Sequence, residues 1–246
     1  MGGDVFDRAN LKRGVWEAAR AGRAQLVCKE LAGHHSKLYA RVIILLPPGE
    51  PLPNWDLWAR VFQWFGPAAA ATTDATAYPF RVYLLASPAD RESPRRGQDL
   101  GPEHVNGGYT RPCSTEGIVI YRSEESTRVL VHEMLHAACL DEASWPVEQR
   151  EAMIETWAEL ILVALLSKGS AAAAAKLWSL QSQWVANTNW RVRRDHGVAD
   201  ATDYAWRYLC GREEMYQRLG VALPAPQPAA AARETSLRFT HPQLGP

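Results

Sequence analysis

An apolar, helix-compatible run in the middle of the chain reads Val129-Leu130-Val131-His132-Glu133-Met134-Leu135-His136. Four residues of α-helix advance a side chain by about 6 Å and return it to nearly the same face. His132 and His136 are therefore predicted to project together, close enough for both imidazoles to bind one ion at roughly 2.0–2.1 Å. Glu133 is then placed beside the pair, where a carboxylate can accept a proton from water. The spacing predicts a zinc site with a general base.

The residues before this motif favour a helix that follows a strand. Residues 117–121 (GIVIY) have the composition of a strand, and Ser123, Ser126 or Thr127 is a candidate cap for the helix. The alternative is a chance match, since a chain with seven histidines should contain H-E-x-x-H about once in a hundred such chains. The strand–helix context favours the metal site.

A second helix is predicted downstream, with Pro146 near its first position and an apolar stretch that runs to Leu166. Glu155 and Glu159 are four residues apart and share one face of this helix. Burying an acidic pair is costly unless positive charge matches it. A zinc ion for one glutamate and a histidine N–H for the other would supply that match. The alternative is two solvated glutamates on an amphipathic helix.

The order of these residues resembles the gluzincin group of zinc metallopeptidases, because His132-Glu133-x-x-His136 is followed, after eighteen residues, by Glu155. The resemblance implies one zinc ion held by His132, His136 and Glu155, with Glu133 as the general base. It also implies that Glu159 orients a ligand histidine and that the substrate is a peptide or protein.

This resemblance covers about forty residues, from Gly117 to Glu159, and has two departures. Ile154 stands where many gluzincins have Asn before the ligand glutamate. No aminopeptidase-type Gly-x-Met-x-Asn segment lies upstream. An aminopeptidase is therefore not expected.

A wider part of the chain is similar to uncharacterised H-E-x-x-H proteins encoded by large DNA viruses. The similar segments are Asn106-Gly107-Gly108-Tyr109-Thr110, Cys113, residues 118–125 and the motif with its continuation Cys139-Leu140-Asp141. This likeness implies association with a virion as one setting and says nothing of the substrate.

The metzincin arrangement H-E-x-x-H-x-x-G-x-x-H is a competing interpretation. Here Cys139 occupies the glycine position and Glu142 the position of the last ligand. Without glycine the sharp return of the chain toward the ion is strained, so this arrangement is disfavoured. Asp141 is predicted to be a helix-end residue or a partner of a ligand, in preference to a ligand.

Composition narrows the class further. The 246 residues carry a formal net charge of zero, which gives no global electrostatic attraction to nucleic acid or to an anionic membrane. The start lacks the layout of a signal peptide, and no apolar run is long enough to span a membrane. The four cysteines, at positions 28, 113, 139 and 210, form no C-x-x-C pair. They are interpreted as free thiols in the cytoplasm or another reducing compartment.

Other elements follow from periodicity and turn residues. The predicted strands are 24–28, 41–46 and 81–85, the predicted helices are 54–65, 170–189 and 201–219, and residues 87–111 form a long loop that could rim a cleft. His34 and His35 are placed in a solvated loop, and Arg191 to Arg194 at a solvated helix end. Residues 222–246 are predicted to be a linker or disordered. Their last part, 233–246, is expected to dock on a partner or on the body of the protein.

These observations predict an α+β, zincin-like domain over residues 1–221. A small mixed sheet (about 20–122) packs on the active-site helix, and a helical lobe (about 123–221) completes the cleft. The expected function is zinc-dependent hydrolysis of peptide bonds, with strand 117–121 aligning the substrate by main-chain pairing. Candidates for stabilising the oxyanion are Tyr109, His196 and Tyr204. The alternatives are a non-catalytic structural or assembly protein, in a virion or elsewhere, and an ion that only stabilises the fold.

Overall fold

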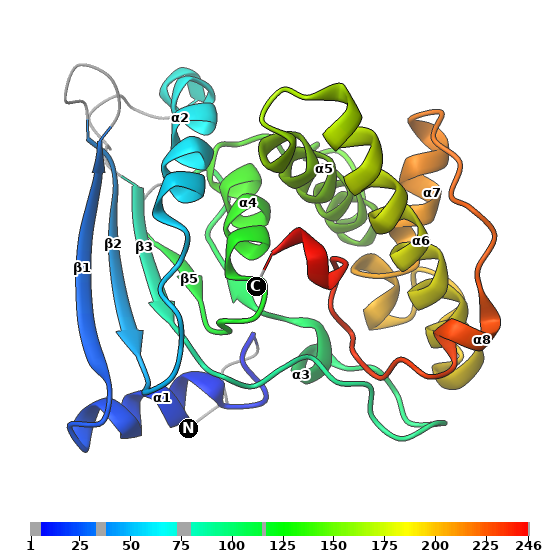
Figure 1. Ribbon diagram of the computed structural model, residues 1–246, viewed down its shortest axis with the longest axis horizontal. Coiled ribbons are helices and arrows are strands. Elements are labelled where there is room, and N and C mark those ends of the chain that lie inside the picture. Colours follow the sequence, from blue (N-terminus) through cyan, green and yellow to red (C-terminus); the bar gives the residue numbers. More distant parts are fainter. Residues whose placement is uncertain (1–5, 33–37, 73–79, 115–116, 246) are drawn as a thin grey trace. The chain divides into compact units, whose positions relative to one another are not determined.

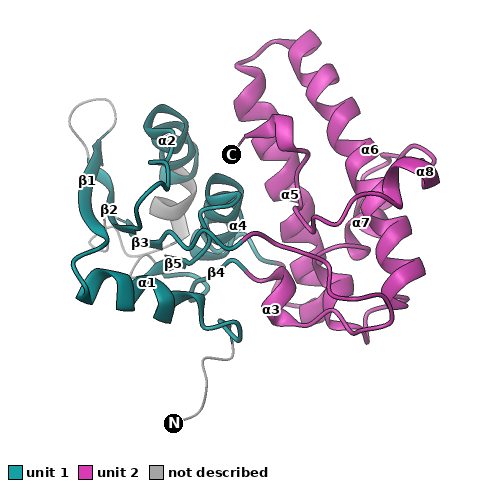
Figure 2. Ribbon diagram, turned by 60° about the horizontal axis from the view of Figure 1, so that its bottom comes forward, with its two compact units in different colours: residues 1–89, 107–141 teal, residues 90–106, 142–246 magenta. Residues whose placement is uncertain are grey.

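The computed structural model describes residues 6–32, 38–72, 80–114 and 117–245, so the predicted loop with His34 and His35 lies outside it (Figure 1). The chain forms two compact units, drawn in different colours in Figure 2. Unit 1 comprises Met1–Ala89 and Gly107–Asp141, and unit 2 comprises Asp90–Asn106 and Glu142–Pro246. This division differs from the single domain expected for residues 1–221. The motif helix belongs with the sheet, and most of the long loop belongs with the helical unit.

Unit 1 is built on a mixed sheet whose five described strands lie in the order β1-β2-β3-β5-β4. The strands are β1 Gln25–Ala32, β2 Leu38–Leu46, β3 Phe80–Leu85, β4 Gly108–Tyr109 and β5 Ile118–Ile120. β1 and β2 are antiparallel, β2–β3 and β3–β5 are parallel, and β4 and β5 are antiparallel. The four predicted strands are confirmed, while the two residues of β4 are too short for a periodic signal.

Helices cover both faces of this sheet (Figure 2). In β2 the alternate residues Ala40, Val42, Ile44 and Leu46 are buried on the face that carries α2 (Trp55–Thr72) and α4 (Ser126–Ala137). The indole N–H of Trp58 donates to the hydroxyl of Thr127 at 2.9 Å and ties α2 to α4. On the opposite face, Val15 of α1 (Leu11–Arg20) packs with Leu85 and Tyr121. Helix α1 was not among the elements predicted from the sequence.

The motif helix begins without a side-chain cap. Glu125, in left-handed conformation at φ 58°, precedes it, and none of the three predicted caps serves that purpose. Thr127 instead accepts the bond from Trp58. The first turn of the helix therefore contacts α2 through Thr127.

Unit 2 consists of helices and connecting segments. They are α3 Pro102–Val105, α5 Val147–Ser167, α6 Ala171–His196, η3 Tyr204–Arg207, α7 Gly211–Arg218, α8 Pro228–Ala231 and η4 Pro242–Leu244. The predicted helix after Pro146 is confirmed as α5. The helix predicted from Ser170 runs on to His196, and the one predicted over 201–219 is interrupted between η3 and α7. At Gly211 a Cβ would lie 2.9 Å from that of Ala152, which shows how closely α7 packs on α5.

The C-terminal segment packs within unit 2 from Ala231 to Leu244, so the prediction of a linker or disordered tail, made for residues 222–246, is wrong for this part. Leu237, Phe239 and Leu244 are buried. The side chain of Gln181 on α6 donates to the carbonyl of Phe239 at 2.8 Å and accepts from the amide of His241 at 2.9 Å. Of the two docking alternatives, the body of the protein is the one observed, because these apolar side chains complete the core of unit 2.

Two of the four cysteines form a disulfide, Cys113–Cys139, so the prediction of free thiols is wrong for this pair. Cys28 is exposed and Cys210 buried, both without a disulfide. A separation of 26 residues gives no local signal, because only folding brings the two Cα atoms to 4.5 Å. Disulfides of this kind persist in oxidising compartments, which removes the argument for a reducing one. In the described part of the chain, no helix has the length and apolar character needed to cross a membrane.

Candidate metal centre

The two motif histidines converge on one point beside α4. Their Nε2 atoms lie 3.1 Å apart and their ring centroids 4.8 Å apart. Both residues are buried, as is the rest of the motif. The helical spacing of four residues produces this convergence, and the prediction that both imidazoles project together is confirmed.

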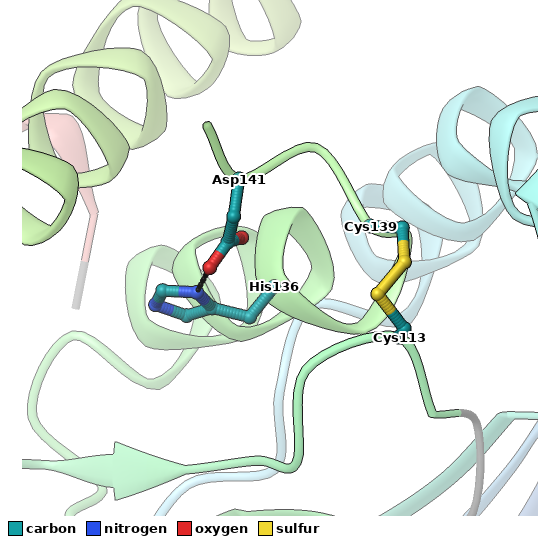
Figure 3. The surroundings of a disulfide bond; sticks show 4 residues. All are labelled: Cys113, His136, Cys139 and Asp141. Atoms are coloured by element: carbon teal, nitrogen blue, oxygen red, sulfur yellow. Dashed lines mark hydrogen bonds and ion pairs between the residues drawn. A yellow bond between two sulfur atoms is a disulfide. The ribbon is translucent and has the colours of Figure 1, made fainter. Parts of the chain in front are cut away.

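Asp141 holds the second nitrogen of His136, as Figure 3 shows. Its Oδ2 lies 2.7 Å from Nδ1 of His136. A carboxylate at Nδ1 favours the tautomer with the proton there, which leaves the lone pair of Nε2 available to a metal ion. Asp141 is thus the partner of a candidate ligand, one of the two roles predicted for it.

The pair fits a metal ion. Two imidazole nitrogens on a tetrahedral zinc ion, each at 2.0–2.1 Å, are separated by about 3.3 Å. The observed separation of 3.1 Å differs from this value by less than the movement of a side chain within its rotamer. The orientation of His136 by Asp141 is the arrangement that ligating histidines commonly have.

Glu133 lies against β4, the end strand of the sheet. A Cβ at Gly108 would be 3.2 Å from Oε1 of Glu133, 2.7 Å from Val129 and 2.8 Å from the carbonyl of Val119. Glycine is therefore needed for the close approach of β4 to α4. The strand predicted to align a substrate, 117–121, is paired on both sides by β3 and β4. That part of the prediction is wrong, and the edge next to Glu133 belongs to β4.

Tyr109 points to the other face of the sheet. Successive side chains of a strand alternate between faces, and Gly108 occupies the face of α4. The hydroxyl of Tyr109 accepts from Nζ of Lys12 at 3.0 Å, and the ring packs with the α1 cluster around Tyr121. Tyr109 is thereby removed from the candidate oxyanion donors.

In unit 2, Glu155 and Glu159 are both buried on α5. Glu159 accepts from Gln181 at 2.8 Å and also from Arg212 and Tyr216. The positive charge that matches Glu159 therefore comes from Arg212 of its own unit. The role of orienting a ligand histidine, predicted for Glu159, is taken for His136 by Asp141.

The two remaining oxyanion candidates also lie in unit 2. Nδ1 of His196 is 2.8 Å from the carbonyl of Gln98, at the end of α6. The hydroxyl of Tyr204 donates to Oδ1 of Asn106 at 3.0 Å and lies 3.4 Å from that of Tyr208. The pKa of Tyr208 is held well above its usual value, mainly because the hydroxyl is buried and secondly because of the negative charge of Glu151. Tyr208 is a half-buried residue that was not among the site residues predicted from the sequence.

Comparison with protein-family models, with curated proteins and with solved structures finds no match for this chain. The structure defines an α+β chain with a mixed sheet and an H-E-x-x-H helix. Within that helix, two histidines converge and a carboxylate orients one of them. These are the features on which a function can be argued.

Proposed function

We propose that this chain is a zinc-dependent peptidase whose centre is built on His132, Glu133 and His136. The observation that carries the proposal is the 3.1 Å approach of the two Nε2 atoms, with Asp141 at 2.7 Å from Nδ1 of His136. A buried pair of imidazoles with their lone pairs directed at one point suits a divalent ion better than it suits packing alone.

The third ligand is assigned to α5 from the sequence. Glu155 has the spacing of the gluzincin ligand. Glu151 lies one turn earlier on the same face of α5 and is tested beside it, although it was not among the ligands predicted from the sequence. The histidines and these glutamates belong to different units, so this assignment stays a prediction. When bound, zinc supplies a Lewis acid and lowers the pKa of a coordinated water to about 7.

The other steps belong to the side chains of unit 1. The carboxylate of Glu133 accepts a proton from the attacking water and delivers it to the nitrogen of the leaving amine. Asp141 keeps the proton of His136 on Nδ1. Main-chain groups of β4, beside Glu133, are suited to pairing with an extended peptide, as the edges of sheets do. Together these groups bind, align and protonate a peptide substrate.

The substitution Glu133→Gln tests this proposal. The general base is lost while both histidines remain, so peptide cleavage should fall by about 10²- to 10⁴-fold and the zinc content should be unchanged. Cleavage is measured by mass spectrometry of a digested peptide library, and zinc by elemental analysis of the same preparations. Equal cleavage by both proteins would show that Glu133 is not the base.

Metal analysis of two further variants separates the candidate third ligands. Glu155→Gln should lower the zinc content after mild chelation and Glu151→Gln should not, whereas the reverse result would move the ligand one turn along α5. A wild-type protein that binds zinc and cleaves no peptide would instead favour the structural or assembly role.

A further inference from the structure

The disulfide lies at the end of the motif helix (Figure 3). Cys113 belongs to the connection between β4 and β5, and Cys139 follows the last turn of α4. The bond therefore links the segment that follows the candidate substrate edge to the helix that carries the candidate ligands. Cys113 is exposed and Cys139 half-buried, so the bond is accessible from solvent.

Both half-cystines hold the main chain of His136. The amides of Cys113 and Cys139 each donate to the carbonyl of His136 at 3.0 Å. Asp141, two residues beyond Cys139, holds the imidazole of the same histidine. One candidate ligand is thus fixed at its carbonyl and at its ring by residues within or next to the disulfide-closed ring.

The backbone of these two cysteines needs such a restraint. Both have φ 58°, in the left-handed region that residues with a Cβ rarely occupy. The amide of Leu140 also donates back to the carbonyl of Leu135 at 3.0 Å, which shapes the turn that presents Asp141. Opening the ring removes the covalent restraint on this turn and favours more common conformations.

We propose that Cys113–Cys139 is a redox-sensitive clamp that sets the metal affinity of the motif histidines. The inference rests on the proposed function, because it concerns regulation of the same site. In the oxidised state the clamp holds His136 and Asp141 in the geometry that suits an ion. In the reduced state His136 loses part of its orientation, and the affinity for zinc falls.

The chemistry is an ordinary thiol–disulfide exchange. A thiolate of a dithiol reductant attacks one protein sulfur, the Cys113–Cys139 bond breaks, and a mixed disulfide forms. The second thiolate of the reductant then displaces the other protein thiol. The protein gains two electrons and two protons as two thiols, and the reductant loses them as its own disulfide.

The test measures zinc affinity of the full chain by competition with a chromogenic chelator. Oxidised protein is compared with protein reduced by a phosphine, which avoids zinc-binding thiol reagents, and with the double variant Cys113→Ser/Cys139→Ser. The reduced and double-variant proteins should bind zinc about tenfold more weakly, the lower end of the effect of losing an outer partner of a ligand. Reoxidation should restore the affinity, and Cys28→Ser, a change at an exposed cysteine outside the disulfide, should behave as wild type.

A second measurement needs no metal and therefore separates this inference from the proposed function. Hydrogen exchange at the amides of Cys139 and Leu140 should become at least about tenfold faster on reduction. If zinc binds to neither the oxidised nor the reduced protein, the proposed function fails. If reduction also leaves hydrogen exchange at these two amides unchanged, the clamp is overturned as well. Equal zinc affinity in both states would overturn the clamp alone. A variant that fails to fold is replaced by reduced wild type, which carries no substitution.

Discussion

Asp141 is the residue whose function depends most on the turn that follows α4. In the sequence it is an acidic residue five positions after His136. In the structure the chain reverses at Cys139, and the carboxylate returns to Nδ1 of His136. A candidate ligand and its partner carboxylate thus come from one short segment of the chain, and their pairing depends on a single turn.

Replacing Asp141 by Asn should weaken zinc binding by about 10- to 100-fold, because an amide favours the required tautomer of His136 less than a carboxylate does. The dissociation constant is measured by chelator competition. Glu142→Gln is the matched control, since its exposed carboxylate accepts hydrogen bonds from the neighbouring Ser144. Equal affinities for the two variants would refute the role of Asp141.

Gly108 is a second residue whose identity is set by its surroundings, because they leave no room for a Cβ. A methyl group there would meet Val129 at 2.7 Å and the carbonyl of Val119 at 2.8 Å. Gly108→Ala should therefore destabilise the protein by about 1–3 kcal/mol, the usual cost of overpacking. Urea unfolding measures the change. Gly117→Ala, where a Cβ meets nothing within 4 Å, should unfold close to wild type, and a similar loss in both variants would contradict the crowding argument.

At the scale of elements, α5 shows how an acidic face is accommodated. The burial of Glu159 is matched by Arg212 of α7, with Gln181 of α6 and Tyr216 of α7 as further donors. Gln181 and Arg212 also donate to the carbonyl of Phe239. The same polar group therefore joins three helices and the C-terminal segment inside unit 2.

Removing the arginine from this group should be costly. Arg212→Met leaves the buried carboxylate of Glu159 without its cation and should lower the free energy of unfolding by about 3–5 kcal/mol. Arg218→Met on the same helix is the control, because its ion pair with Glu214 is exposed and contributes less than about 1 kcal/mol. Thermal and urea unfolding report both. A loss below 1 kcal/mol at Arg212 would contradict the structural role assigned to Glu159.

At the scale of the whole molecule, the chain passes between the two units more than once. After Ala89 the chain enters unit 2 for residues 90–106. It then returns to unit 1, where it forms β4, β5 and α4. The position of residues 90–106 within unit 2 is set by hydrogen bonds with distant segments, such as the bond from the amide of Leu237 to the carbonyl of Arg91 at 2.8 Å. Each unit is therefore assembled from segments that are distant in the sequence.

The four cysteines differ in pairing and exposure, so their reactivity tests the fold of both units. In the oxidised native protein, iodoacetamide at pH 8 should modify one cysteine, Cys28, because it is exposed. Burial raises the pKa of the Cys210 thiol to about 12 and keeps it neutral and inaccessible. The stability gained from neutral Cys210 is present below the usual thiol pKa of about 8.5 and is lost as the pH rises toward 12. Mass spectrometry of the labelled protein checks the count, and rapid labelling of Cys210 before unfolding would contradict the fold of unit 2.

The local elements could be predicted from the amino-acid sequence alone. The spacing of His132 and His136, the apolar strands and the helix after Pro146 depend on periodicities of a few residues, and all are present in the structure. The third ligand, the zinc ion and the hydrolytic activity stay predictions, because they depend on that spacing together with a resemblance.

The contacts between residues that are distant in sequence could be identified only in the folded units. These are the disulfide between Cys113 and Cys139, the match of Glu159 with Arg212, the docking of the C-terminal segment on α6 and the place of β4 beside Glu133. No local periodicity of the sequence predicts such pairs. Their partners are selected by the burial of apolar surface and by the need of each buried polar group for a partner, and both are settled only when the whole unit has folded.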